Sequence, residues 1–225
     1  MFLEPTPIRF DFHTHSLLSD GELLPVELAR RYSCKGYRAV AIADHLDASN
    51  IETVIPAVVK GTEMWNAAPE TDVRLIPAAE ITHVPPSQIG ALVTEARRLG
   101  ARIVVVHGET LNEPVVAGTN RAALEAGADI LSHPGLISEE DAALAAEKGI
   151  FLEVTARAGH CLTNGHVVAV ARKAGASIVI SSDAHVPGDI PGPESAARVG
   201  LGAGLSPAEL SEIERQMAQL AGKFV

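Results

Sequence analysis

The stretch Asp11-Phe12-His13-Thr14-His15-Ser16 lies close to the N-terminus, and the rest of the chain is organised around it. Side chains on an extended strand alternate between two faces, so His13 and His15 point to the same side. Five later apolar runs also end in residues that can bind a metal: Asp44 with His45, Glu80, His107, His133, and Asp183 with His185. The sequence therefore predicts a polynuclear metal site assembled from strand ends.

Length and composition favour one globular domain. The 225 residues are 47% hydrophobic, and one α/β barrel or one open sheet would use all of them. We therefore expect a single domain over residues 1–225. The formal net charge of -10 argues against binding to long nucleic acid, which needs clustered Lys and Arg. It remains compatible with a small phosphorylated substrate held in a metal-lined cleft, and the oligomeric state stays open.

The cysteines and the N-terminus bear on the cellular location. Cys34 and Cys161 are too few for a disulfide framework and lack a zinc-binding spacing, which indicates reduced thiols in a cytoplasmic protein. Residues 1–5 show no basic region followed by an apolar stretch. No apolar run approaches the roughly twenty residues of a membrane span. We therefore expect neither export nor contact with a membrane.

Short β-rich runs alternate with helix-compatible segments along the chain. Strands are predicted at residues 8–12, 39–43, 73–79, 102–106, 129–132, 150–154 and 176–182. Helices are predicted at 21–36, 50–67, 87–99, 113–127, 138–149, 164–175 and 206–222. A kink or break is expected at Pro56, and a Gly/Pro-rich segment precedes the last helix.

Strands that alternate with helices imply parallel pairing, with the helices outside. A barrel and an open doubly wound sheet both satisfy this pattern. The ligands of an open sheet gather at one switch point, whereas here nearly every strand ends in a polar residue. This distribution favours the C-terminal mouth of an α/β barrel.

Each candidate ligand also has an ordinary structural explanation. A lone histidine at a strand end is more often a hydrogen-bonded core residue, but six at equivalent positions favour a shared metal site. Asp20 is equally consistent with a helix N-cap, and Asp183 with a capped turn, although Asp183 shares a face with His185. A buried carboxylate at Glu80 is costly unless it meets cations or donors, so a bridging metal ligand is favoured there.

Together these motifs resemble the polymerase and histidinol phosphatase (PHP) superfamily. The pattern is His-x-His at the first strand with Ser-Asp-Gly after it, Asp-His at the second, Glu at the third, and then His, His-Pro and Asp-x-His. The resemblance implies a distorted seven-stranded (β/α)7 TIM-like barrel, three metals at its mouth, and phosphoester hydrolysis. The Ser-Asp-Gly form is closer to small free-standing members than to histidinol phosphatases, which usually carry histidine at Asp20.

The resemblance also implies which residues bind each metal. The first ion would be held by His13, His15, Glu80 and Asp183, the second by Glu80, His107 and His133, and the third by Asp20, His45 and His185. The catalytic residues would be Glu80, Asp183 and His185.

This ligand set suits two to three divalent transition-metal ions, with zinc, manganese and iron all acceptable. Such cations lower the pKa of a bridging water and polarise phosphoryl oxygens, so that hydroxide attacks without a protein nucleophile. Asp11 and Asp44 stand beside ligand histidines and are candidates to orient imidazoles, although solvated strand-end carboxylates are equally ordinary.

Residues for substrate binding are expected after the sixth strand. Arg157 shares the residue parity of Glu153, which predicts that it faces the mouth and grips phosphate in a bidentate fork. A surface arginine on a loop explains the position equally well. His160 is a second candidate in the same loop, and His83 is expected at the rim.

The leading hypothesis is a metal-dependent phosphoesterase that hydrolyses a small phosphomonoester such as histidinol phosphate or a nucleotide. A C–N hydrolase of the amidohydrolase type is the main alternative, because that class also begins with His-x-His in a barrel. It usually carries a metal-bridging carbamylated lysine on the fourth strand, where this chain ends its run in His107. Short-oligonucleotide exonuclease activity and a non-catalytic scaffold are further alternatives.

Overall fold

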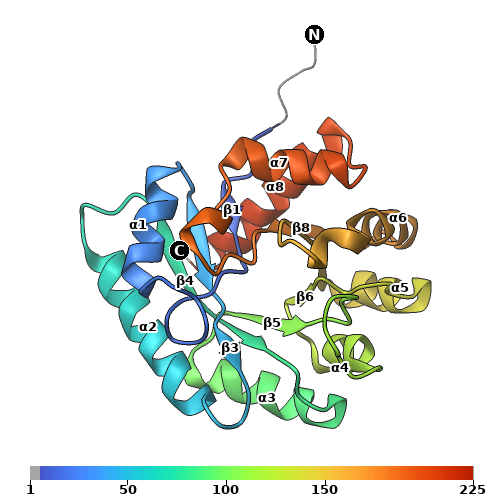
Figure 1. The fold of residues 1–225 in the computed structure, drawn as a ribbon, viewed down its shortest axis with the longest axis horizontal. Coiled ribbons are helices and arrows are strands. Elements are labelled where there is room, and N and C mark those ends of the chain that lie inside the picture. The colour runs from blue at the N-terminus through green and yellow to red at the C-terminus, as the bar shows by residue number, and fades with distance from the viewer. Residues whose placement is uncertain (1–5, 225) are drawn as a thin grey trace.

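In the computed structural model, which describes residues 6–224, seven parallel strands form a nearly closed barrel (Figure 1). The strands are β1 (Phe10–Asp11), β2 (Ala39–Ile42), β4 (Arg74–Ile81), β5 (Ile103–His107), β6 (Ile130–Ser132), β7 (Phe151–Thr155) and β8 (Ile178–Ser181). They pair in the order β1-β2-β4-β5-β6-β7-β8. The expected seven-stranded TIM-like barrel is confirmed.

The chain segments that follow β1 and β8 close the barrel. Thr14 and Ala184 form an isolated parallel bridge. The backbone N–H of His15 donates to the carbonyl of Ala184 at 2.9 Å, and the N–H of Asp183 donates to the carbonyl of His13 at 2.9 Å. Two segments about 170 residues apart in sequence are thereby held side by side at the carboxyl ends of their strands.

A short strand, β3 (His45–Leu46), extends β2 after a break at Ala43 and Asp44. Both strands pair with β4 in one register, since Ala39 lies opposite Arg74 and His45 opposite Glu80. The sequence analysis did not predict this strand, but its register places His45 beside Glu80.

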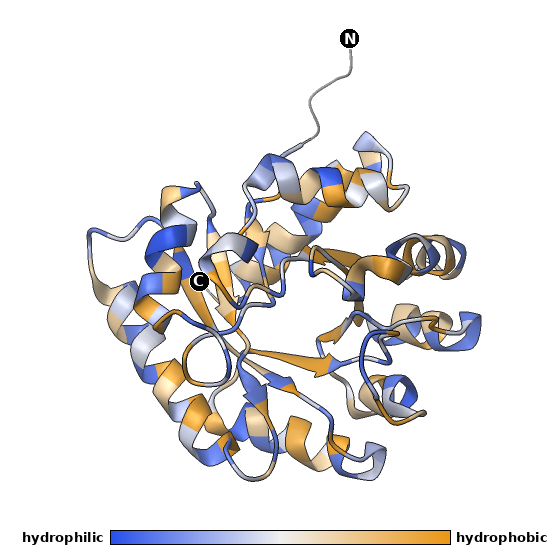
Figure 2. Ribbon diagram, in the orientation of Figure 1, coloured by the Kyte–Doolittle hydropathy of each residue, from blue (hydrophilic) through white to orange (hydrophobic). Residues whose placement is uncertain are grey.

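The helices pack around the outside of the barrel (Figure 1). They are α1 (Pro25–Cys34), α2 (Ile51–Ala67), α3 (Pro86–Leu99), α4 (Thr119–Ala126), α5 (Glu139–Lys148), α6 (Asn164–Ala174), α7 (Pro193–Gly202) and α8 (Pro207–Gly222). Short 3-10 turns occur at His160–Thr163 and Pro187–Asp189. The strands are strongly hydrophobic and the helices show hydrophobic and hydrophilic sides (Figure 2), so the core lies in and around the sheet.

The predicted helix ends are mostly correct because local chemistry sets them. Ser138 accepts a hydrogen bond from the N–H of Asp141 at the start of α5. Ser206 and Glu209 form a capping box at the start of α8, with proline next in the chain. The left-handed Gly100, with φ of 111°, ends α3.

Three expectations about helices are wrong. The helix expected at 113–127 begins only at Thr119, because the Glu109 carboxylate accepts the N–H groups of Gly118 and Asn120 and fixes the helix start there. The Gly/Pro-rich segment contains α7, whose Pro193 is at the first helical position. The third is the break considered at Pro56, because α2 continues through this residue as one helix, and the kink stays a prediction.

Gly135 lets the chain after β6 pass close to the loop after β5. It has φ of 62°, and a Cβ atom there would lie 1.8 Å from the carbonyl oxygen of Glu109. Gly149 is a matched control, because its φ is 68° but no atom lies within 4 Å of its ideal Cβ. We expect Gly149→Ala to lower the free energy of unfolding by about 1 kcal/mol. Gly135→Ala should lower it by about 3 kcal/mol or more, because the backbone must also move. Urea unfolding measures both, and equal losses would contradict the close approach.

Across residues 6–224, no helix combines the length and apolar character that a membrane crossing needs. The expectation that the N-terminus carries no export signal falls on residues 1–5, outside the described part of the chain.

Candidate metal centre

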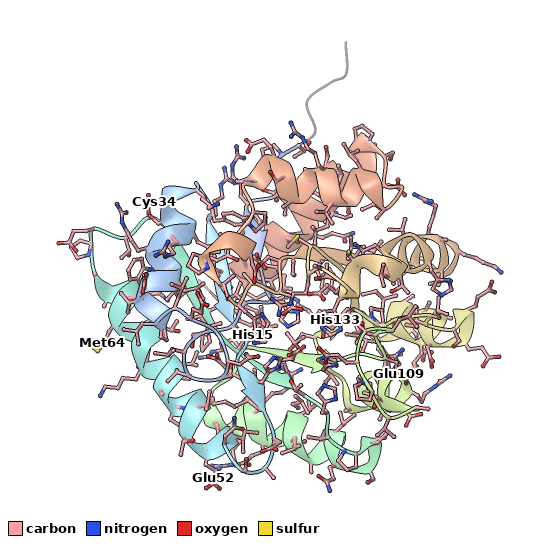
Figure 3. All side chains as sticks on the ribbon, viewed as in Figure 1. His15, Cys34, Glu52, Met64, Glu109 and His133 are labelled. Atoms are coloured by element: carbon pink, nitrogen blue, oxygen red, sulfur yellow. The ribbon has the colours of Figure 1, made fainter. Side chains whose placement is uncertain are left out.

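The structure gathers the predicted ligands at the carboxyl ends of the barrel strands. His13 and His15 follow β1, His133 follows β6, and Asp183 and His185 follow β8. Figure 3 places the labelled His15 and His133 near the middle of the barrel, far from peripheral residues such as Cys34. The predicted ligands in or next to the sheet are buried, except His45, which is half-buried. Asp20 differs from them, because it lies in the loop after β1 and 55% of its side chain is exposed.

Glu80, fully buried in β4, is the central carboxylate. Its Oε1 lies 3.0 Å from His13 Nε2 and 3.8 Å from His133 Nε2. Its Oε2 lies 2.7 Å from His45 Nδ1 and 3.9 Å from His15 Nε2. One carboxylate therefore faces four imidazoles, as a ligand that bridges two cations would.

Asp183 is the second central carboxylate. Its Oδ1 lies 3.1 Å from His15 Nε2 and 3.8 Å from His13 Nε2. It also lies 3.4 Å from His185 Nδ1, while Oδ2 is 3.7 Å from His133 Nε2. Asp183 has φ of 54°, a left-handed conformation that costs energy for a residue other than glycine. Such strain is typical of functional sites.

Asp20, His45 and His185 form the outer part of the centre. Asp20 Oδ1 lies 3.5 Å from His45 Nε2 and 3.3 Å from His185 Nε2. Asp20 is not the N-cap of α1, which is Leu24. The N–H of Glu22 donates to the carbonyl of His185 at 2.8 Å and ties the Asp20 loop to the segment after β8. These three residues are the ones that the sequence analysis assigned to the third metal ion.

Neighbouring groups orient the imidazoles so that Nε2 is available. His13 Nδ1 lies 2.8 Å from Glu153 Oε1, and His185 Nδ1 lies 3.0 Å from the carbonyl of Asp183. Carboxylates and carbonyls accept hydrogen bonds, so in each ring Nδ1 carries the proton. The Nε2 atom then has a free lone pair in the neutral ring, which is the arrangement found in metal-binding histidines.

Several buried nitrogens in this centre have no hydrogen-bond partner: Nε2 of His13, both ring nitrogens of His15, and Nδ1 of His133. Leaving a buried polar atom unpaired costs about 1–3 kcal/mol, so the cluster needs a further partner. Three groups of side chains have ligand atoms within 4.8 Å of one another: His13 with His15 and Glu80, His13 with His133 and Asp183, and His15 with Asp20, His45 and His185. The residues fit divalent metal ions.

The electrostatics of the buried cluster also favour bound cations. Burial raises the pKa of the Glu80 carboxyl, but the charges of His13 and His45 outweigh burial and hold the pKa well below its usual range. Burial lowers the pKa of His13, but Glu153, Glu80 and Asp183 outweigh burial and raise the pKa well above its usual range. The carboxylates thus stabilise positive charge near His13 Nε2, where a metal cation would supply it.

His107 differs from the expected grouping. The sequence analysis placed it with Glu80 and His133, but its Nε2 lies 3.0 Å from Glu113 Oε2. Together with His83, these residues form a fourth cluster of potential metal ligands in the described chain.

The sequence analysis missed two residues at the barrel mouth. Glu153 is fully buried in β7, bonds His13, and accepts the N–H of His133 at 3.0 Å. The sequence does carry a signal for Glu153, because a carboxylate within an apolar strand is costly to bury unless it has a partner. Glu113 was assigned to the start of a helix, and no local pattern indicates that its loop returns to the barrel mouth.

The sequence analysis suggested that Asp11 and Asp44 orient imidazoles, but the structure gives both carboxylates a different role. Asp44 accepts hydrogen bonds from the N–H and hydroxyl of Ser16 and from the hydroxyl of Ser19. Asp11 accepts from the Tyr32 hydroxyl and from backbone N–H groups, including that of His13. Both carboxylates therefore fix the backbone around the centre. Burial raises the pKa of Asp11 to about 6.

Arg157 and His160 have different neighbours in the structure. Arg157 donates to Asp189 Oδ2 at 3.0 Å, and Asp189 also accepts the N–H of His185. His160 stacks on His133, with ring centroids 4.3 Å apart, and its Nδ1 lies 2.8 Å from Thr110 Oγ1. Contact of either residue with substrate remains a prediction.

A cavity of about 510 Å³ opens beside the outer part of the centre. Its lining includes Asp20 and His45 from the centre, Asp47 and Asn50 near the start of α2, and Glu113. Arg157 lines a different cavity, which shares no residue with this one. The side chains that meet an incoming molecule beside the centre therefore include three carboxylates and neither lysine nor arginine.

The fold and the site define a parallel α/β barrel with a histidine- and carboxylate-rich centre at its mouth. No family model matches the chain. The chain is 46% identical over 208 residues to the uncharacterized protein MJ1295 of Methanocaldococcus jannaschii, covering 90% of this chain and 93% of that protein. It belongs to the same protein family as MJ1295.

Solved structures of the same fold include an amidohydrolase, with a TM-score of 0.61 and 15% identity over 96% of this chain and 74% of that chain. Another is the N6-methyl-AMP deaminase of Arabidopsis thaliana in its apo form, with a TM-score of 0.59 and 11% identity over 97% of this chain and 96% of that chain. At these identities the likeness shows the fold alone.

These findings correct the PHP assignment drawn from the sequence. No family model supports it, and the solved structures found to share the fold include an amidohydrolase and an N6-methyl-AMP deaminase. The physical reason is that histidines and carboxylates at strand ends recur in barrels of different families, so their order along the chain did not identify one.

Proposed function

We propose that the protein is a metal-dependent hydrolase of the amidohydrolase type, acting on a carbon–nitrogen bond. The observation that carries the metal dependence is the convergence of Glu80 and Asp183 on imidazoles whose buried nitrogens lack other partners. The names of the similar structures, an amidohydrolase and a deaminase, describe hydrolysis at carbon–nitrogen bonds and support this choice of substrate bond.

The charge of the adjoining cavity supports a carbon–nitrogen substrate over the phosphomonoester that the sequence analysis favoured. A phosphate dianion would depend on the bound cations alone, because the cavity lining offers no lysine or arginine to grip it. A neutral amide needs no such cationic grip. Arg157, the predicted phosphate grip, is already paired with Asp189.

The side chains of such a site would have different roles. Divalent cations supply Lewis acidity and lower the pKa of water. Glu80 and Asp183 hold the negative charge that retains them, and Glu153 fixes His13 with Nε2 facing Glu80. Since Asp20 and His45 line the cavity, the substrate's reacting carbon would approach from that side. His160 stacks on His133 but does not line this cavity, so its contact with the substrate stays a prediction. Glu80 would take the place of the lysine bridge usual in amidohydrolases.

A substrate panel tests this proposal. Protein loaded in turn with Zn²⁺, Mn²⁺ and Fe²⁺ is incubated with dipeptides, N-acyl amino acids, aminopurine nucleosides and phosphomonoesters. We expect release of ammonia or a free amine from at least one nitrogen class, and loss of this activity after chelation. Release of inorganic phosphate without any amine would replace the proposal with a phosphoesterase. Hydrolysis that survives complete metal removal would also contradict it.

A further inference from the structure

Glu113 connects three imidazoles at the rim of the barrel mouth. Its Oε2 lies 2.9 Å from His83 Nε2 and 3.0 Å from His107 Nε2, and its Oε1 lies 3.4 Å from His160 Nε2. These residues come from four places: the end of β5 and the loops that follow β4, β5 and β7. The arrangement is not needed to complete the central cluster, whose carboxylates are Glu80, Asp183 and Asp20.

The ligand atoms of His83, His107 and Glu113 meet within 4.8 Å of one another. His107 Nδ1 lies 3.2 Å from the carbonyl of Gly108, which can only accept, so Nδ1 is the donor. The neutral ring then presents the Nε2 lone pair toward His83 and Glu113. Two imidazoles and one carboxylate are a ligand set that Zn²⁺ and neighbouring transition metals accept.

The backbone at His83 gives a second, independent observation. Its φ is 55°, and only two other non-glycine residues among 6–224 have a positive φ, namely His133 and Asp183. Both of these belong to the central cluster. The left-handed conformation is unfavourable for histidine, and such positions concentrate where a side chain must be aimed. His83, 41% exposed, has no core packing to explain this conformation.

The loop that carries Glu113 is fixed rather than free to drift. The Glu109 carboxylate accepts the N–H groups of Gly118 and Asn120, and Asn120 Oδ1 accepts the N–H of Glu109 in return. Thr110, which lies in the same loop as Glu113, forms a hydrogen bond with His160. Glu113 is thus presented to the imidazoles by a braced segment, as a preorganised ligand needs.

We propose that His83, His107 and Glu113 bind a divalent transition-metal ion at the rim, in a site separate from the central cluster. Three protein ligands leave a coordination position for water or a substrate group, as in open zinc sites. That position opens toward the cavity, because His83 and Glu113 both line it. The rim ion would sit next to the central ones, since the rings of His107 and His133 are 4.4 Å apart.

Metal binding by variants tests the rim site without any assay of hydrolysis, so it stands or falls independently of the proposed reaction. The variants are Glu113→Gln, which keeps the size of the side chain, and His83→Asn, because asparagine tolerates left-handed backbone. Glu63→Gln is the matched control, because Glu63 is an exposed acidic residue on α2 and is not part of the mouth. Thermal unfolding by circular dichroism confirms that each variant is folded.

Each protein is stripped, titrated with Zn²⁺ and Co²⁺, and its ions per chain are counted by elemental analysis after buffer exchange. We expect both rim variants to bind one ion fewer than wild type, with affinity for that ion lowered by about 100-fold or more. The Glu63→Gln control should match wild type. Wild-type stoichiometry and affinity in either rim variant would overturn the site, and Glu113 would then serve only as a hydrogen-bond partner of the imidazoles.

Discussion

Glu80→Gln should lose at least one bound metal ion and lower hydrolysis by about 100-fold or more. The carboxylate faces four imidazoles from a fully buried position, with Oε1 3.0 Å from His13 Nε2 and Oε2 2.7 Å from His45 Nδ1. Glutamine keeps the shape, but it removes the negative charge and replaces one ligand oxygen by an NH₂ group. Two cations that share this bridge would both be weakened.

Elemental analysis and turnover of the metal-loaded proteins measure this effect. Glu63→Gln again serves as the control, and it should retain full metal content and activity because it has no contact with the centre. Unchanged metal content with unchanged turnover in Glu80→Gln would remove Glu80 from the centre. Circular dichroism establishes that the variant is folded before its metal content is compared, because removing one partner of a buried charge cluster is destabilising.

The strand-end ligands were predictable because two simple rules specify them. Alternation puts His13 and His15 on one face, and parallel strands bring their carboxyl ends to one mouth. Glu80 was predictable from the cost of an unpaired carboxylate in an apolar run. The same rule applies to Glu153, which the sequence analysis passed over although it lies in an equally apolar run.

Other features depend on contacts that no local pattern encodes. Whether Asp20 capped a helix or faced the metal ligands was decided by Leu24 at the helix start and by the bond between Glu22 and His185. Glu113 reaches the mouth because Glu109 moves the start of α4 to Thr119. The family and substrate were the least predictable, because ligand residues specify a metal centre, whereas the cavity beside it selects the substrate.

Glu153→Gln should lower metal affinity by about 100-fold while leaving the fold intact. Both oxygens of Glu153 are used: Oε1 lies 2.8 Å from His13 Nδ1 and Oε2 accepts the N–H of His133 at 3.0 Å. A glutamine has one acceptor oxygen for these two donors. If its NH₂ group faces His13, the ring must carry its proton on Nε2 and can no longer bind a cation there. If the NH₂ group faces His133, it opposes a backbone N–H and displaces the His133 ligand.

A tautomer change of this kind has a direct spectroscopic readout, which a general loss of stability would not reproduce. In metal-free protein, at a pH high enough to leave the His13 ring neutral, its ¹⁵N resonances should move from the Nδ1–H form toward the Nε2–H form in Glu153→Gln. Glu214→Gln is the matched control, because Glu214 also accepts a backbone N–H, that of Arg9 at 3.0 Å, but lies on α8 away from the centre. It should keep wild-type metal affinity. Equal metal affinity in Glu153→Gln and Glu214→Gln would show that Glu153 does not position His13, whereas weaker binding with an unchanged His13 tautomer would assign the loss to the displaced His133.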